Sequence, residues 1–150
     1  MKKIRVYLAG TIYNNEPGFS WKNRFIDELN GKIQFNPKPS CNCERGTSWR
    51  EDLFDLYECF DPNPSNECNN TMIARDKAEI QKSDIFVAYI EKFSCGTSME
   101  ILCAYNQQTI PIFIINPGLN FSNDLWLKYH SHLICNTVID CSEHIKEIKF

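Results

Sequence analysis

Two apolar runs constrain the fold of this chain more than any other feature. Residues 84–90 read DIFVAYI and residues 109–115 read TIPIFII, and both are apolar over nearly their whole length. A strand with one face in water alternates polar and apolar residues, whereas a strand covered on both faces is apolar throughout. The two runs therefore predict central strands of a parallel sheet that has helices on both faces.

Further strand and helix patterns alternate along the rest of the chain. We expect strands at 4–10, 32–36 and 137–140, and helices at 19–30, 71–82, 97–107, 124–133 and 142–148, with Thr71 as an N-cap. Strands that alternate with helices indicate a parallel sheet with right-handed crossovers. The sequence thus predicts a single α/β domain over residues 1–150, built as a doubly wound, five-stranded sheet. Residues 38–70 are irregular, apart from a helix expected at 49–57.

Composition argues against two broad classes of protein. The 150 residues carry a formal net charge of −3, whereas a protein that binds the nucleic-acid backbone normally shows a basic face. No apolar run approaches the roughly 20 residues that span a bilayer. The first residues lead directly into a strand pattern and not into a signal-peptide core. We therefore expect a cytosolic protein with no nucleic-acid or membrane partner.

The eight cysteines leave a minor alternative open. They are Cys41, Cys43, Cys59, Cys68, Cys95, Cys103, Cys135 and Cys141. Without an export signal, reduced thiols are expected and not a disulfide framework. The first four could bind zinc and make residues 41–68 an interaction domain, although their spacing matches no common structural site. The last four lie in apolar stretches and are expected in the core.

Glu100 has two interpretations that do not exclude each other. It follows Thr97 by three residues at the start of a predicted helix, which is the spacing of a capping box with Thr97 as N-cap. The same helix start would hold a carboxylate ionised, through backbone N–H groups and the helix dipole. An ionised, positioned carboxylate is also what nucleophilic attack on an anomeric carbon requires.

Asp76 and Tyr7 also have two interpretations each. Asp76 falls on the apolar stripe of its predicted helix, either as a border acid paired with a neighbouring Arg75, Lys77 or Lys82, or as a site residue. Tyr7 is either a core residue of the first strand or a hydroxyl delivered near the strand's carboxyl end. In a doubly wound fold, that edge of the sheet is where ligands bind.

Small residues follow two of the predicted strands at this edge. Gly10 ends the first strand and could permit close approach of the backbone to a ligand. Ser94 and Thr97 flank Gly96 before a helix and could donate hydrogen bonds to a phosphate or sugar oxygen. Neither a Walker loop nor a G-x-G-x-x-G motif occurs, so a common mononucleotide or dinucleotide loop is not indicated.

Four segments in this order resemble the nucleoside 2-deoxyribosyltransferase family, which includes 2'-deoxynucleoside 5'-monophosphate N-glycosidases. They are YLAG at 7–10, WK at 21–22, Asp76 ahead of SDIFVA at 83–88, and GTSMEI at 96–101. The resemblance covers about residues 3–116 and is sharpest at 72–111. It implies a flavodoxin-like fold, with the irregular region at about 38–70 as an insertion.

The resemblance also implies roles for three residues. Glu100 would be the nucleophile that attacks C1' of a 2'-deoxyribosyl group and forms a covalent intermediate. Asp76 would bind the nucleobase and help to protonate it, and Tyr7 would orient the carboxylate. A second base in a transferase, or water in a hydrolase, would then attack the intermediate. No metal or organic cofactor is expected, and the partners would be a deoxynucleoside or deoxynucleotide and a nucleobase.

One position departs from the nucleoside transferases of the family. They tend to carry an Asp six residues before the nucleophile, whereas this chain has Ser94, as the monophosphate hydrolases do. A serine hydroxyl can donate to a 5'-phosphate that a carboxylate would repel. The family also implies a homo-oligomer in which a neighbouring subunit completes each site, with Asn123 or Asp124 as the nearest candidates. A non-catalytic nucleotide-binding module on the same fold remains the alternative from a different functional class.

Overall fold

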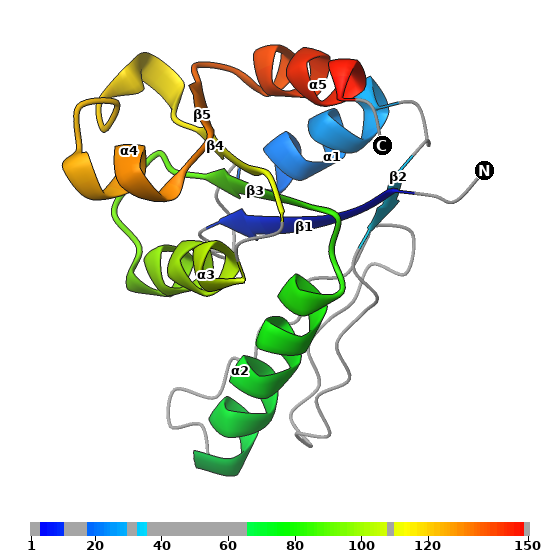
Figure 1. Ribbon diagram of the computed structural model, residues 1–150, viewed down its shortest axis with the longest axis vertical. Coiled ribbons are helices and arrows are strands. Elements are labelled where there is room, and N and C mark those ends of the chain that lie inside the picture. Colours follow the sequence, from blue (N-terminus) through cyan, green and yellow to red (C-terminus); the bar gives the residue numbers. More distant parts are fainter. Residues whose placement is uncertain (1–3, 11–17, 30–32, 36–65, 108–109, 149–150) are drawn as a thin grey trace.

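The computed structural model describes residues 4–10, 18–29, 33–35, 66–107 and 110–148 (Figure 1). The helix predicted at 49–57 and most of the irregular region lie outside the described residues. So do Cys41, Cys43 and Cys59 of the zinc interpretation.

Within the described residues the sheet has five parallel strands, the number that the sequence predicted. They are β1 (Ile4–Gly10), β2 (Ile33–Phe35), β3 (Ile85–Tyr89), β4 (Ile112–Ile115) and β5 (Leu133–Cys135). Their spatial order is β2-β1-β3-β4-β5, so the winding direction reverses between β1 and β3. Tyr7 lies opposite Phe86 across this central pair. A ligand site is expected outside the carboxyl ends of these two strands, because the connections that leave them run to opposite faces of the sheet.

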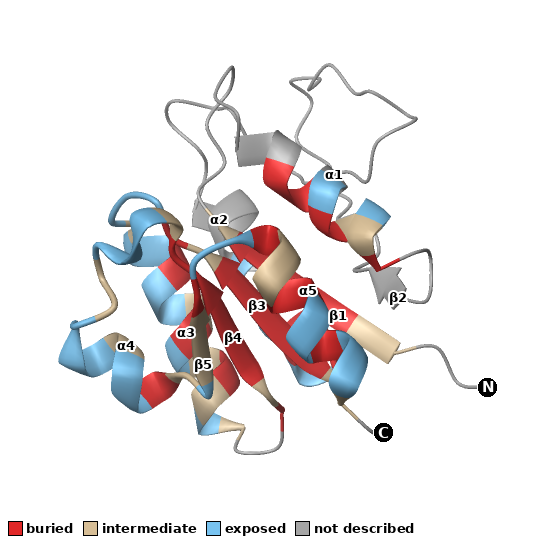
Figure 2. Ribbon diagram, turned by 90° about the horizontal axis from the view of Figure 1, so that it is seen from above, coloured by how far each residue is buried: buried red, intermediate tan, exposed pale blue. Residues whose placement is uncertain are grey.

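Helices cover both faces of the sheet (Figure 1). Helices α1 (Gly18–Glu28) and α5 (Val138–Glu147) contact each other on one face, and α2 (Asn66–Gln81) and α3 (Cys95–Asn106) contact each other on the other. A short 3-10 helix, η1 (Pro117–Leu119), and α4 (Leu125–His130) connect β4 to β5. Figure 2 shows the central strands buried between helices whose outer surfaces are exposed.

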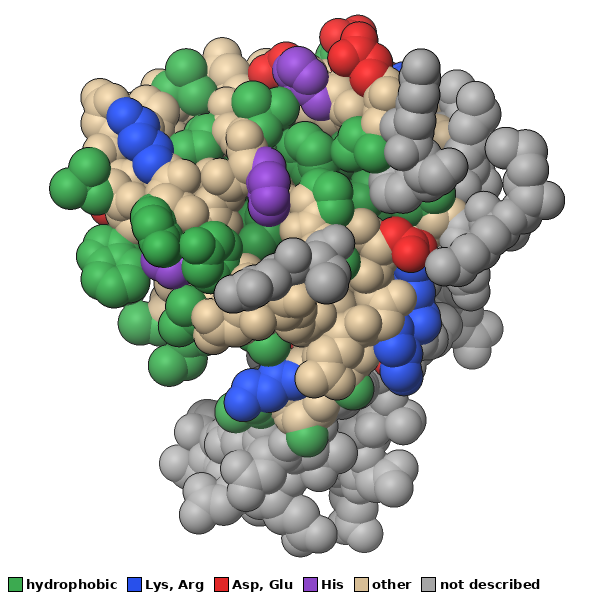
Figure 3. Space-filling model, viewed as in Figure 1, with side chains coloured by type: hydrophobic (Ala, Val, Ile, Leu, Met, Phe, Trp, Pro, Cys, Tyr) green, Lys and Arg blue, Asp and Glu red, His purple; other side chains and the backbone are tan. Residues whose placement is uncertain are grey.

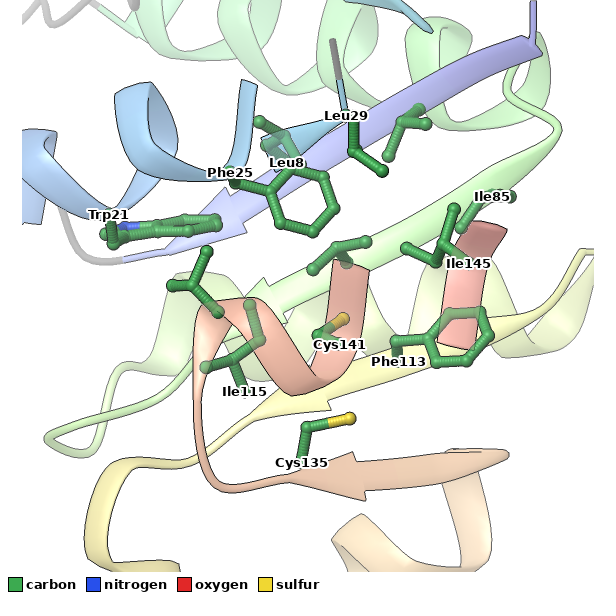
Figure 4. Close-up of a cluster of buried hydrophobic side chains, with 13 residues drawn as sticks. Leu8, Trp21, Phe25, Leu29, Ile85, Phe113, Ile115, Cys135, Cys141 and Ile145 are labelled. Atoms are coloured by element: carbon green, nitrogen blue, oxygen red, sulfur yellow. The ribbon is translucent and has the colours of Figure 1, made fainter. Parts of the chain in front are cut away.

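Each face of the sheet has its own hydrophobic core. The core under α1 and α5 includes Trp21, Phe25 and Cys141 together with Leu8 of β1 (Figure 4). The core under α2 and α3 includes Tyr7, and alternate residues of β1 therefore serve opposite cores. Cys135 and Cys141 are buried as expected, whereas Cys95 is exposed and Cys103 is partly exposed.

Two predicted N-caps, Thr71 and Thr97, are corrected by the structure. Helix α2 begins at Asn66, so Thr71 lies inside it and is not its N-cap. The N-cap of α3 is Ser94, and Thr97 is the third residue of the helix, so the predicted capping box is wrong. Polar first turns carry no apolar periodicity, and the pattern therefore places helix starts too late.

The last strand was predicted too late in the chain. It is Leu133–Cys135, which pairs with β4, and not 137–140. Thr137 is instead the N-cap of α5, and its side chain accepts a hydrogen bond from the backbone N–H of Asp140. The β-branched run at 137–139 resembled a strand, but the cap begins a helix there. As a result α4 is shorter than predicted and α5 starts earlier.

Phe25 tests the contribution of the α1 side of the core. Its ring is fully buried, and its truncation in Phe25→Ala removes packing that the neighbours cannot fully replace. We expect the free energy of unfolding in urea to fall by about 3–5 kcal/mol. Arg24→Ala, at an exposed position on the same helix, is the control and should change it by less than about 0.5 kcal/mol. A loss below about 1 kcal/mol for Phe25→Ala would contradict this packing.

Candidate active site

The structure brings Tyr7 and Glu100 into direct contact at the switch point of the sheet. The Tyr7 hydroxyl donates a hydrogen bond of 2.6 Å to Glu100 Oε1, between residues 93 positions apart in the chain. The Tyr7 ring is held by a stacked contact with Phe86 of β3, with ring centroids 5.5 Å apart. The two interpretations of Tyr7 therefore hold together: its ring is part of the core, and its hydroxyl reaches Glu100.

Burial dominates the electrostatics of Glu100. The pKa of its carboxyl is raised from 4.5 to about 7, first by burial and then by the charge of Asp76, while the Tyr7 hydrogen bond and the charge of Lys22 lower it. The residue as a whole keeps intermediate exposure, so a ligand can reach it. The expectation that the helix start keeps this acid ionised is wrong. Glu100 is the sixth residue of α3, beyond the free amides of the first turn.

Asp76 lies on α2 and is partly exposed. Its charge is felt by Glu100, which puts the two carboxylates within electrostatic reach of each other. The basic residue Lys82, one of the predicted partners of Asp76, forms a salt bridge with Glu79 at 3.0 Å. Two carboxylates with different surroundings are the arrangement in which one acts as nucleophile and the other as acid.

The first turn of α3 presents donors beside the site. Ser94 Oγ accepts hydrogen bonds from the Thr97 backbone N–H at 3.4 Å and from Thr97 Oγ1 at 3.2 Å, so its own proton can be donated to a ligand. Thr97 is buried and holds the cap, whereas Gly96 is exposed. A Cβ at Gly96 would meet only Ser94 Oγ, at 4.0 Å, and the described residues leave room for a side chain there.

Gly10 permits the close approach of a side chain, that of Trp21. A Cβ on Gly10 would lie 3.1 Å from the Trp21 ring and 3.4 Å from the Tyr89 carbonyl oxygen. Trp21 stacks on Tyr89 with ring centroids 5.0 Å apart, and Figure 4 shows it beside the carboxyl end of β1. The glycine thus lets α1 pack tightly against the ends of β1 and β3.

Lys22 is a site residue that the sequence interpretation did not assign a role. It is only 7% exposed, its Nζ donates to the Leu8 carbonyl oxygen at 3.2 Å, and its charge acts on Glu100. A signal was present, because Lys22 precedes Phe25 and Leu29 by three and seven residues and so falls on the buried stripe of α1. Asp76 was singled out in the sequence for the same reason, because it falls on the apolar stripe of its predicted helix.

Asn116 is a second buried polar residue that the sequence interpretation missed. Its side-chain amide donates to the Ile90 carbonyl oxygen at 2.7 Å and accepts from the Phe121 backbone N–H at 2.8 Å. These bonds tie the end of β3 to the loop after β4. Asn123, in that loop, is exposed and accepts from Lys128 Nζ at 3.3 Å. Among the described contacts, none joins Asn123 to Tyr7, Asp76 or Glu100.

An apolar groove of about 400 Å³ lies between α3 and α4. Its lining includes Ser94 and Thr97 of the first turn of α3, together with Ile101, Trp126 and His130. In Figure 3 hydrophobic side chains gather over α4 and the adjoining part of α3. The groove borders the candidate site but does not include Glu100.

Within the described part of the chain, no three His, Cys, Asp or Glu side chains are grouped as a metal ion would require. The described helices also include none that is long and apolar enough to cross a membrane.

Comparisons with solved structures identify the class of fold. The chain is similar to a 2-deoxyribosyltransferase from the psychrotolerant bacterium Bacillus psychrosaccharolyticus, with a TM-score of 0.63 and 17% identity, over 98% of this chain and 93% of that one. It is also similar to the Clostridium botulinum CMP N-glycosidase, with a TM-score of 0.54 and 15% identity, over 95% and 98%. No protein-family model and no curated protein sequence matches it. At these identities the likeness shows the flavodoxin-like deoxyribosyltransferase fold.

The raised pKa of Glu100 predicts how stability depends on pH. Between pH 4.5 and 7 the unfolded chain has released this proton while the folded protein keeps it, so the group makes stability fall as pH rises. Glu100→Gln removes this effect. Between pH 4 and pH 8, we expect the free energy of unfolding of the wild type to fall by about 3 kcal/mol relative to that of Glu100→Gln. Urea unfolding of both proteins across this range measures it. Parallel pH profiles would contradict the raised pKa.

Proposed function

We propose that this protein cleaves or exchanges the N-glycosidic bond of 2'-deoxynucleosides or their 5'-monophosphates, as a member of the nucleoside 2-deoxyribosyltransferase family. One observation carries the proposal: the hydrogen bond between Tyr7 and Glu100 at the carboxyl ends of β1 and β3. A tyrosine that fixes one carboxylate oxygen leaves the other oxygen to approach a sugar carbon. The similarity in fold to a transferase and an N-glycosidase is consistent with this chemistry.

The proposed first step forms a bond between a Glu100 oxygen and C1' of the deoxyribose. The bond between C1' and the base nitrogen breaks, and its electron pair leaves with the base, which Asp76 helps to protonate. A pKa of about 7 leaves about half of the Glu100 carboxyls ionised at neutral pH, and the ionised form is the nucleophile. Attack on C1' by a second base or by water then breaks the ester bond and restores the configuration of C1'.

The first turn of α3 is the proposed binding site for the 5' end of the substrate. The Ser94 hydroxyl and backbone N–H groups of the first turn, including that of Gly96, would donate to a phosphate, which the positive end of the helix also favours. Thr97 holds Ser94 in place and need not touch the ligand. This arrangement favours a 5'-monophosphate, a class of substrate that the CMP N-glycosidase named above also has.

The test is release of free base, followed by chromatography. We expect base from deoxynucleosides or deoxynucleoside monophosphates, and a new nucleoside or nucleotide only with an acceptor base if the protein is a transferase. Hydrolysis of a monophosphate would give deoxyribose 5-phosphate without an acceptor. Glu100→Gln should lower the rate at least about a thousandfold, because it removes the nucleophile but keeps the shape of the side chain.

Two controls make this outcome decisive. Glu91→Gln removes a carboxylate at an exposed position near the same edge of the sheet and should leave the rate unchanged. Binding of deoxynucleotide by wild type without base release would instead identify a non-catalytic module. Full activity of a folded Glu100→Gln protein would remove the nucleophile assignment.

A second copy of the chain is the proposed partner at the groove between α3 and α4. Exposed apolar side chains line the groove and the adjoining surface of α4, namely Phe93, Met99, Leu102, Leu125, Trp126 and Tyr129. At about 150–250 Å² for a large side chain, they expose on the order of 800 Å². That exceeds the largest patch of a typical monomer, about 300–600 Å², and equals one side of a standard interface. Asn123 lies next to this surface and could reach a neighbouring site.

Replacement of Trp126 tests this interface. Trp126→Asp places a charge at the centre of the exposed surface, and we expect the oligomer measured by light scattering to dissociate to monomer, because the charge would be buried without a partner. Lys128→Asp changes the charge of an exposed residue on the same helix and is the control. A wild-type protein that is monomeric at tens of micromolar would contradict the proposal.

A further inference from the structure

Asn116 is a fully buried asparagine whose side chain joins two distant parts of the chain. It follows β4 directly and is the N-cap of η1, in an extended backbone conformation and with an exposed fraction of 0%. An asparagine at this position usually accepts a hydrogen bond from the start of its own helix. Asn116 makes no such bond. Its Nδ2 donates to the Ile90 carbonyl oxygen at 2.7 Å, and its Oδ1 accepts from the Phe121 backbone N–H at 2.8 Å.

The bond to Ile90 replaces one that the pairing of β3 with β4 cannot form. The Ile90 N–H donates to the Ile115 carbonyl oxygen at 2.8 Å, one residue beyond the end of β3. In a parallel pair, a residue that donates to one partner residue accepts from the residue two positions further along, so the Ile90 carbonyl would pair with the N–H of residue 117. That residue is Pro117, which has no N–H. Asn116 supplies the donor that this buried carbonyl requires.

Phe121 lies in the loop between β4 and α4, which is closed by further hydrogen bonds. The Leu119 N–H donates to the Asn116 carbonyl oxygen at 2.9 Å, and the Asp124 N–H donates to the Phe121 carbonyl oxygen at 2.9 Å. Leu119 has a φ of 55°, a left-handed conformation that is uncommon for a residue other than glycine. Asp124 is the N-cap of α4. The bond between Phe121 and Asn116 therefore fixes a loop of defined shape that leads into α4.

Ile90 leads in the other direction, to the first turn of α3. Ser94 follows it by four residues and is the N-cap of α3, and its carbonyl oxygen accepts from the Ser98 N–H at 3.1 Å. Ile90, Ser94 and Phe121 all belong to the lining of the groove between α3 and α4. Asn116 is thus bonded to one lining residue on each side of the groove, Ile90 on the side of α3 and Phe121 on the side of α4.

We propose that Asn116 is a positioning residue of the candidate site: its amide links Ile90 to Phe121 and so sets where the first turn of α3 lies relative to the loop before α4. Asn116 touches no ligand itself, because it is fully buried. It acts through the connection from Ile90 to Ser94, which leads to the donors proposed for the 5' end of the substrate. The consequence for the substrate rests on the proposed function, whereas the link between the two segments does not.

Two substitutions separate the two hydrogen bonds of Asn116. Asn116→Asp keeps an acceptor for the Phe121 N–H but places a carboxylate oxygen against the Ile90 carbonyl, whereas Asn116→Ala removes both bonds. Asn136→Ala is the matched control. Asn136 is exposed and accepts from the Gly118 N–H at 2.9 Å, so its truncation removes a bond from the same loop without any described contact to Ile90.

Amide hydrogen exchange measures the link without any substrate. In Asn116→Asp we expect the Ser98 amide to exchange about tenfold faster while the Phe121 amide stays protected, because the bond that is lost is the one to Ile90. In Asn116→Ala both amides should exchange faster, and in Asn136→Ala neither should change. An unchanged Ser98 amide in both folded Asn116 variants would overturn the proposal, because Asn116 would then serve only its own loop.

Steady-state kinetics of base release test the consequence for the substrate. We expect Asn116→Asp to raise KM for a deoxynucleoside 5'-monophosphate roughly tenfold, with a smaller rise for the deoxynucleoside, because a displaced first turn of α3 holds the 5'-phosphate less well. Asn136→Ala should match wild type. A loss of folded protein alone would lower kcat equally for both substrates and leave both KM values unchanged, and that result would refute the role in positioning the 5' end.

If the Asn116 variants do not fold, native-state exchange of the wild type in low urea decides. The link predicts that the Phe121 and Ser98 amides open together, with the same free energy and the same dependence on urea. Different dependences on urea would refute it. A wild-type protein that releases no base would refute the proposed function, while the exchange measurements would still test Asn116.

Discussion

The hydrogen bond between Tyr7 and Glu100 is the interaction on which the rest of the site depends. It joins residues 93 positions apart and forms only because β1 and β3 are neighbours and α3 returns over β1. Burial alone would favour a neutral acid, which is a poor nucleophile. The tyrosine hydroxyl opposes that effect and fixes the direction of one oxygen. The fold therefore determines both the position and the charge of Glu100.

Opposing effects of the surroundings set the pKa of the Glu100 carboxyl. Burial and Asp76 raise the pKa of its carboxyl, whereas Tyr7 and Lys22 lower it, and the result is a pKa of about 7. Such a value leaves about half of the Glu100 carboxyls ionised at neutral pH, and the ionised form is the nucleophile that we propose. Because the negative charge of Asp76 raises the pKa of Glu100, the protonation states of the two carboxyls are linked.

The sequence was sufficient to predict the fold, whereas the roles proposed for Tyr7, Asp76 and Glu100 remain predictions. Apolar runs that match β3 and β4 can only be buried on both faces, and this constraint led directly to the parallel sheet. The helix starts and β5 were misplaced because caps such as Ser94 and Thr137 act through geometry that residue types do not reveal. Lys22 was quoted only as part of the WK segment and was given no role, because one lysine on an apolar stripe is ordinarily a side chain whose amine reaches water.

The most direct test of the central claim is intact-protein mass spectrometry with a slow substrate. A 2'-fluoro-arabino nucleoside or its 5'-monophosphate should react with Glu100 to form an ester with the fluorosugar. This ester should hydrolyse slowly enough to be detected, because fluorine destabilises the positive charge that develops at C1'. We predict a mass increase equal to one fluorosugar, or its 5-phosphate, less one water, on the peptide that contains Glu100. Base release from the normal substrate with the fluorosugar adduct on another residue would contradict the account.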